Sequence, residues 1–148
     1  ALIALTVAIW QGIVTRKHNR LSVKPLLRID RNIIVGQGAS IELRNNGVGP
    51  AIIKSVQVLV DSTPIPENSP DLRLEALKKV GLSHIQWQLY ALYPDEPFGV
   101  GEKHDLISCQ SPITDKATIE TVQKALFRIS FKINYTSVYN QKFTLTHE

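Results

Sequence analysis

Residues 39–61, ASIELRNNGVGPAIIKSVQVLVD, contain two segments in which apolar and polar residues alternate, separated by turn-forming residues. In the first segment Ile41 and Leu43 alternate with polar neighbours, and in the second Val56 and Val58 fall on one face. Alternation with a period of two is typical of half-buried β-strands. The intervening Asn-Asn-Gly supplies turn chemistry. This stretch therefore predicts two strands joined as a hairpin-like pair.

The same alternation recurs along most of the chain. A helix is expected from Pro70 to a stop at Gly81, because Ser69 is a capping residue and proline suits the first helical position. A second short helix is expected at 117–125. About seven strands joined by turns fit a mainly β fold, an antiparallel immunoglobulin-like β-sandwich with two short inserted helices. The further strands are expected at residues 21–35, 85–92, 104–109, 127–136 and 142–146.

The amino-terminal segment differs from the rest of the chain. Residues 1–14, ALIALTVAIWQGIV, carry no charge, and basic residues follow at 16–20. Apolar residues on every side of a helix indicate an apolar environment all around it. Fourteen helical residues span ~21 Å, less than the ~30 Å hydrocarbon core. We therefore expect a transmembrane-type helix that begins upstream of Ala1. The residues predicted to lie at the membrane interface are Trp10, Arg16, Lys17 and Arg20.

Two other interpretations of this segment stay open, a cleaved secretory signal and a buried helix of the globular core. Because Lys and Arg near a span stay on the cytoplasmic side, we expect a single-pass protein of the inner (cytoplasmic) membrane. The helix would contact the lipid bilayer, and the globular domain would lie in the cytoplasm. The single Cys109 fits a reducing compartment. The predicted parts are an anchor helix at 1–15, a basic juxtamembrane neck at 16–20 and a β-sandwich domain at 21–148.

The charge distribution excludes one class of function. The net charge is +4, but residues 1–31 contain six of the 17 Lys and Arg residues and only one of the 13 acidic residues. Residues 32–148 are therefore close to neutral. A nucleic-acid-binding domain carries its basic residues over a broad face. We expect no nucleic-acid partner.

Motifs for cofactor or metal chemistry are not present in the sequence. The glycine pairs at 36–38 and 99–101 lack the spacing of phosphate-binding loops. Cys109 and His104 fall on opposite faces of an alternating strand, which favours a buried structural thiol over a nucleophile and base. No catalytic residue, cofactor or metal is predicted, because the histidines are not at metal-ligand spacing. They are His18, His84, His104 and His147.

Acidic and aromatic residues gather between residues 87 and 105. Asp95-Glu96 and the pair Glu102 and Asp105 flank a Pro/Gly-rich stretch, which suggests either a solvated turn or a two-carboxylate hydrolase site. Trp87 alternates with apolar neighbours and is expected in the core. The residues predicted to form a surface for a protein partner are Tyr90, Tyr93 and Phe98.

Two short motifs carry a resemblance to a known group of proteins. Residues 16–25, RKHNRLSVKP, follow an apolar helix, and residues 45–51 are NNGVGPA. Together they resemble uncharacterised small bacterial single-span membrane-anchored proteins with a β-rich soluble domain. The resemblance implies an inner-membrane anchor and a β-rich domain, and it transfers no catalytic residue.

The sequence predicts a membrane-tethered binding or assembly module without catalytic activity. A sandwich offers strand edges and end loops for recognition, and tethering raises the local concentration of a partner. The alternative is a small membrane-anchored hydrolase with a site in residues 95–109.

Overall fold

The chain is mainly β, with two antiparallel sheets and three helices in residues 2–109 and 111–147, which the computed structural model describes. The helices are α1 (Leu2–Ser22), α2 (Leu72–Lys79) and α3 (Lys116–Phe127). The longer strands are β1 (Leu27–Ile34), β2 (Gly38–Asn45), β3 (Ala51–Val60), β7 (Lys103–Cys109), β8 (Ile129–Thr136) and β9 (Lys142–His147). The two-residue strands are β4 (Thr63–Pro64), β5 (Gln88–Leu89) and β6 (Pro97–Phe98).

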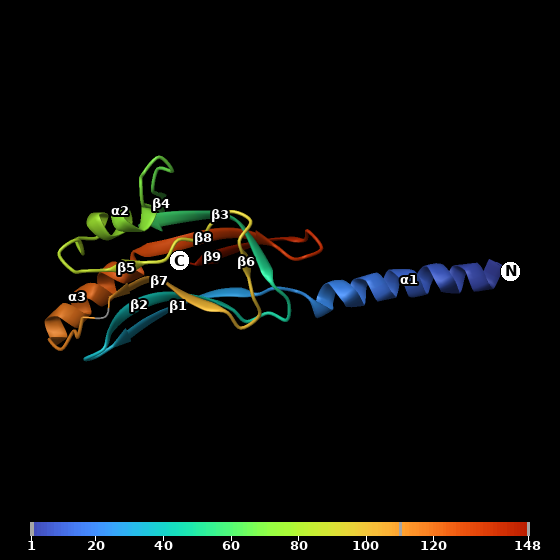
Figure 1. The fold of residues 1–148 in the computed structure, drawn as a ribbon, viewed down its shortest axis with the longest axis horizontal. Helices are drawn as coiled ribbons and strands as arrows, with labels where there is room; N and C mark the ends of the chain where they lie inside the picture. Colours follow the sequence, from blue (N-terminus) through green and yellow to red (C-terminus); the bar gives the residue numbers. More distant parts are fainter. Residues whose placement is uncertain (1, 110, 148) are drawn as a thin grey trace.

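The strands are divided between two layers that run side by side (Figure 1). One sheet has the order β1-β2-β7-β5, and the other has the order β4-β3-β8-β9 with β6 also paired to β3. All neighbouring strands are antiparallel. The first order corresponds to the A-B-E-D sheet of immunoglobulin-type domains, and β3-β8-β9 corresponds to their C-F-G sheet. The β-rich fold predicted from the alternation is confirmed.

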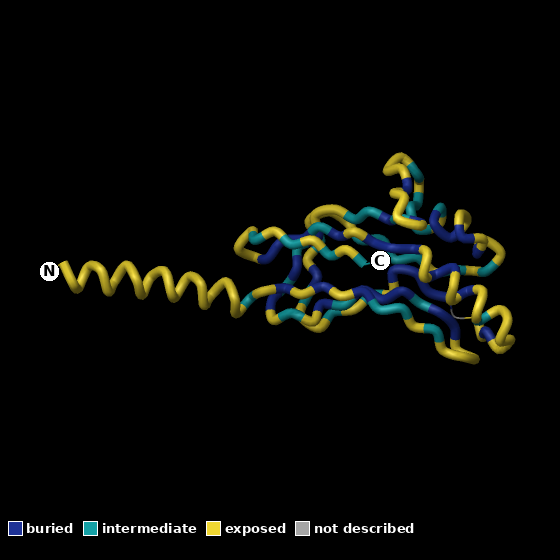
Figure 2. The backbone as a smooth tube through the Cα atoms, turned by 180° about the vertical axis from the view of Figure 1, so that it is seen from behind, coloured by how far each residue is buried: buried dark blue, intermediate teal, exposed yellow. Residues whose placement is uncertain are grey.

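One hydrophobic core lies between the sheets. Ile41 and Ile107 of one sheet and Phe131 and Ile133 of the other belong to the same cluster of buried side chains. Leu77 of α2 also joins this cluster. Buried segments line the facing sides of the strands, while α1 is exposed throughout (Figure 2). Burial of each large apolar side chain stabilises the fold by roughly 1.5–3 kcal/mol.

The predicted hairpin-like pair of residues 39–45 and 51–61 is wrong, because β2 and β3 lie in different sheets. Asn45 stabilises the crossover between them and is fully buried. Its Oδ1 accepts hydrogen bonds from the backbone N–H groups of Leu26 (3.2 Å) and Gly47 (2.9 Å). Its Nδ2 donates to the carbonyl oxygens of Gly49 (2.9 Å) and Phe98 (3.1 Å). All four hydrogen-bonding positions of this amide are therefore used.

The two glycines of the crossover allow close contact between main chains. A Cβ atom on Gly47 would lie 2.3 Å from the nitrogen of Leu26, and one on Gly49 would lie 2.0 Å from the oxygen of Val23. The N–H of Asn46 donates to the carbonyl of Leu26 at 2.8 Å. Any larger side chain at these glycines would separate the crossover from the segment before β1.

The predicted transmembrane helix is wrong. Helix α1 projects from the sheets (Figure 1), and none of its residues is buried. Among the described residues, 2–109 and 111–147, no helix has the length and hydropathy needed to cross a membrane. The uncharged run ends at Thr15, and Arg16, Lys17 and Arg20 lie within the same helix.

Two predicted elements between β3 and β7 have different boundaries in the structure. Helix α2 begins after Asp71 rather than at Ser69-Pro70, because the Asp71 carboxylate accepts from the N–H groups of Arg73 and Leu74. Of the strand predicted at 85–92, only β5 forms, and it pairs with β7. The sheet therefore ends at β5, and the chain on either side of it is irregular.

Arg31 of β1 connects the first sheet to β8 and β9 of the second sheet. Its Nη2 donates to the carbonyl of Ile129 at 2.7 Å, and its Nη1 lies 3.4 Å from Nε2 of His147. Its guanidinium also lies over the ring of Phe127. Burial lowers the pKa of Arg31. Burial and the charge of Arg31 also lower the pKa of His147, partly offset by Asp30.

Replacement of Asn45 is expected to destabilise the fold strongly. Asn45→Ala leaves four backbone groups without their hydrogen-bond partner. Each unsatisfied buried group costs about 1–3 kcal/mol. The free energy of unfolding should therefore fall by ~3 kcal/mol or more. Urea denaturation measures this loss. Asn46→Ala is the matched control, because Asn46 is exposed, and its effect should stay within ~0.5 kcal/mol. Equal unfolding midpoints for both variants would contradict the proposed role of Asn45.

Acidification is expected to destabilise the protein through His147. The folded state lowers the pKa of this histidine from 6.5, so the unfolded chain binds the proton more readily. Its stabilising contribution is therefore present above pH 6.5 and decreases as the pH falls through that value. Urea denaturation of the wild type and His147→Gln, on both sides of pH 6.5, isolates this effect. A difference between the two proteins that does not change with pH would contradict it.

Candidate functional site

A groove of about 390 Å³ opens along one side of the sandwich, between β3, the start of α2 and residues 90–94. We call it the β3 groove. Its floor is formed by Val58, Leu106 and Phe131, each only 1% exposed. An apolar interior with a few polar groups at the entrance is common in binding sites. The polar residues that line the β3 groove are Lys54, Ser55, Glu67, Ser69, Asp71, Arg73 and Tyr90.

Two short segments already pair with the outer edge of β3. At one end, the N–H of Ile53 donates to the carbonyl of Glu96 (3.0 Å), and the carbonyl of Ile53 accepts from the N–H of Asp95 (2.7 Å). At the other end, the carbonyl of Val58 accepts from the N–H of Ile65 (2.9 Å). Strands β6 and β4 extend these two contacts. Both ends of the edge are therefore covered.

Val56 lies between the two covered ends, on the wall of the groove. Backbone groups of alternate residues in an antiparallel strand point to the same side. The register with β8 is unbroken from Ser55 to Val60, so Val56 faces the same outer edge as Val58. No backbone bond joins Val56 to a segment on that edge within residues 2–109 and 111–147. Among the described residues, the N–H and C=O groups of Val56 therefore have no backbone partner on this edge.

Residues 90–94 form the outer wall of the groove, and Glu96 holds this wall in place. The two carboxylate oxygens of Glu96 accept from the N–H of Tyr93 (2.9 Å) and from the hydroxyl of Tyr90 (3.3 Å). Burial and the charge of Glu96 raise the pKa of Tyr90, which keeps its hydroxyl protonated as a donor. Asp95 forms an ion pair with Lys54 at 2.5 Å. The wall is therefore ordered without a ligand.

Arg73 connects α2 to the same wall. Its Nε and Nη2 donate to the two carboxylate oxygens of Asp71, each at 3.0 Å, and its Nη1 donates to the carbonyl of Tyr90. Burial by itself would raise the pKa of Asp71, but the hydrogen bonds and charge of Arg73 outweigh burial and lower it. Paired N–H···O bonds of this kind fix the orientation of both groups.

His104 packs against one face of the Tyr90 ring. The two rings are stacked, with centroids 4.1 Å apart, and Phe98 contacts His104 edge-on at 5.5 Å. Nε2 of His104 lies 2.7 Å from Oε1 of Glu102, whose other oxygen accepts from the N–H of Gly99. The Gly99 N–H and then His104 lower the pKa of Glu102. This cluster fixes the loop after β6 against the wall.

The three predicted partner-surface residues have different surroundings. Tyr93 is 66% exposed, whereas Tyr90 is half-buried against His104 and lines the groove. Phe98 is only 1% exposed, because β6 turns it into the core. The structure thus brings Tyr90 and Tyr93 to one wall, and Phe98 does not lie on the surface.

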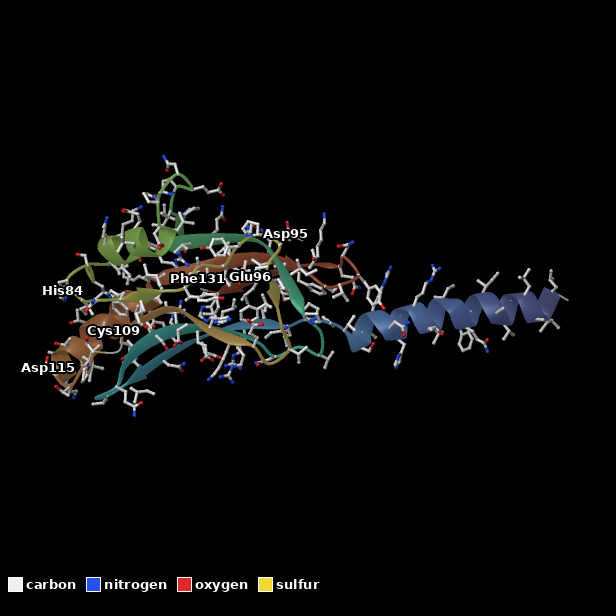
Figure 3. The ribbon with its side chains drawn as sticks, in the orientation of Figure 1. His84, Asp95, Glu96, Cys109, Asp115 and Phe131 are labelled. Atoms are coloured by element: carbon white, nitrogen blue, oxygen red, sulfur yellow. The ribbon has the colours of Figure 1, made fainter. Side chains whose placement is uncertain are left out.

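Of the candidate hydrolase residues, Glu96, Glu102 and His104 lie around Tyr90, whereas Cys109 does not join them. Asp95, Glu96 and Glu102 each bind a loop or a neighbouring side chain. His104 contacts Glu102 rather than the buried Cys109. Figure 3 shows Cys109 at the end of the sandwich far from α1, and Asp95 and Glu96 in the half nearer α1. These carboxylates therefore have structural contacts, and no group of three or more His, Cys, Asp or Glu residues in the described chain could hold a metal.

The predicted membrane-interface residues lie on α1, away from the β3 groove. Trp10 is 64% exposed, and Arg16, Lys17 and Arg20 are also exposed. They follow one another along a helix that projects from the sheets (Figure 2). The structure does not bring them together with Tyr90 or Tyr93.

Comparisons with known proteins add no relative. No known protein family matches the chain, and no curated protein matches its sequence. The resemblance to small membrane-anchored proteins stays a prediction.

Sequence reasoning missed the β3 groove and two of its main residues, Arg73 and Val56. The one local signal was Asp71, which follows Ser69-Pro70 and is as good a capping residue as serine. Recognising Asp71 as the cap would have placed Arg73 in the first turn of α2. The free edge at Val56 has no local signal, because it depends on where residues 63–65 and 95–98 end.

Loss of the Arg73 side chain is expected to loosen the outer wall of the groove. Arg73→Met removes the hydrogen bond from Arg73 to the carbonyl of Tyr90. A hydrogen bond from a charged group contributes about 1.5 kcal/mol or more. Loss of this energy should make amide exchange at residues 90–94 about tenfold faster. Hydrogen exchange followed by mass spectrometry measures this change. Lys79→Met removes an equal charge at an exposed position of α2 and should leave the wall unchanged. Unchanged exchange in Arg73→Met would show that the wall is held by other contacts.

Proposed function

We propose that this domain is a non-catalytic binding module for a protein partner and that the β3 groove is its binding site. The observation that carries the proposal is an apolar floor next to an uncovered strand edge. Sheet edges of this kind bind partners through main-chain hydrogen bonds, and an adjacent pocket gives side-chain selectivity. The volume of about 390 Å³ accommodates one or two side chains of a partner.

The order of the groove walls supports binding. Glu96 and Arg73 hold the outer wall through contacts that involve only this chain. A site that is already ordered loses little conformational entropy when a partner binds. Tyr93 adds an exposed aromatic ring beside the groove, a residue type that is common at interfaces.

The surroundings of the acidic residues support a function without catalysis. A two-carboxylate hydrolase needs one group to donate a proton and another to act as nucleophile or base. Asp95 is paired with Lys54, and Glu96 and Glu102 accept hydrogen bonds from the backbone. No observation in this region favours the hydrolase over a binding module.

Blocking the groove is expected to abolish binding. The probe is a displayed library of random short peptides, selected on the wild-type chain. Ser69→Trp places an indole ring at the entrance of the β3 groove. Because this side chain competes for the site, the affinity for the selected peptides should fall at least ~tenfold. Fluorescence anisotropy with the labelled peptide measures the affinity.

The control is Ser83→Trp, which makes the same substitution at an exposed position outside the groove lining. It should leave the affinity unchanged within ~twofold. A library that yields no peptide sensitive to Ser69→Trp would overturn the proposal.

A further inference from the structure

We infer that the β3 groove binds its partner as an extended peptide segment that adds a short strand to β3 at Val56. This inference rests on the proposed function and specifies the chemistry of the partner. Residues 95–96 and 63–65 already pair with the same edge at Ile53 and Val58. An added strand would use the backbone groups of Val56 between them and continue an existing pattern of pairing.

The length of the added strand follows from the two covered ends. Ile53 and Val58 are five residues apart, about 16 Å at roughly 3.3 Å per residue. Both of these residues already have partners on the outer edge. The space between them suits about three residues of a peptide, which must bend away from β3 at either end.

The short opening also determines which partners are excluded. A long exposed edge pairs with the edge of another sheet, which leads to aggregation. Here β4 and β6 cover the ends of β3, so the long edge strand of a second copy has no room to pair. A flexible peptide segment can enter where a sheet cannot.

The groove also indicates the side chains of the segment. Successive side chains of a strand point to opposite faces, so one of them would face the floor formed by Val58, Leu106 and Phe131. The cations at the entrance, Lys54 and Arg73, already pair with aspartates. The site therefore favours a segment with a central apolar side chain.

Proline at position 56 tests the strand addition directly. Val56→Pro removes the N–H group that would pair with the peptide. It removes no hydrogen bond to β8, because this N–H faces the outer edge of β3. Proline is tolerated at such an edge position. The probe is the peptide selected from the library. We expect Val56→Pro to lower the affinity for this peptide at least ~tenfold. Val56→Thr keeps both the N–H and the branched shape, and its affinity should stay within ~twofold of the wild type.

Amide exchange on the unmodified protein gives a second measurement, which does not depend on how Val56→Pro folds. Without peptide, the amide of Val56 should exchange faster than those of Ser55 and Gln57, which face β8. Saturation with the peptide should slow exchange at Val56 by ~tenfold or more. NMR spectroscopy resolves these amides individually.

The outcomes separate the two proposals. If the peptide binds in a manner sensitive to Ser69→Trp, but neither Val56→Pro nor exchange at Val56 responds, strand addition is wrong and the binding function stands. If no selected peptide is sensitive to Ser69→Trp, the binding function and the strand addition both fail. Weakening by Val56→Pro together with slowed exchange at Val56 supports both.

Discussion

The buried amide of Asn45 is the interaction on which the arrangement of the two sheets depends. It binds the segment before β1, the crossover itself and the end of β6 with one side chain. The chain consequently leaves the sheet of β2 and enters the other sheet as β3. Because β3 is then paired with β8 on one side only, its outer edge is available to the short segments at residues 63–65 and 95–98.

Charged residues near the groove mainly hold the backbone. Arg73, Glu96 and Glu102 each connect a loop to a neighbouring element, and the pKa of Glu102 is lowered by such contacts. Acidic pairs in the sequence suggested either a turn or a catalytic pair. The structure shows the contacts of a turn, because the backbone N–H groups of residues 93 and 99 need acceptors.

The amino-terminal helix shows that a short apolar run does not by itself predict a membrane-spanning helix. Residues 1–14 carry no charge, and the helix continues through Arg16, Lys17 and Arg20 to Ser22. Whether a helix can cross a membrane depends on about 20 consecutive residues rather than on its most apolar part.

The sequence by itself determined where most elements lie. Alternation located β2, β3, β7 and β8 within a few residues, and the NNGVGP stretch at 45–50 marked a place with unusual backbone geometry. Only the tertiary structure decided that β2 and β3 separate, that Phe98 faces the core, and that residues 53–58, 67–73 and 90–94 form one groove. Alternation specifies which side of a strand is buried. Any neighbouring strand can satisfy backbone hydrogen bonds, so the choice of partner depends on contacts between residues far apart in the chain.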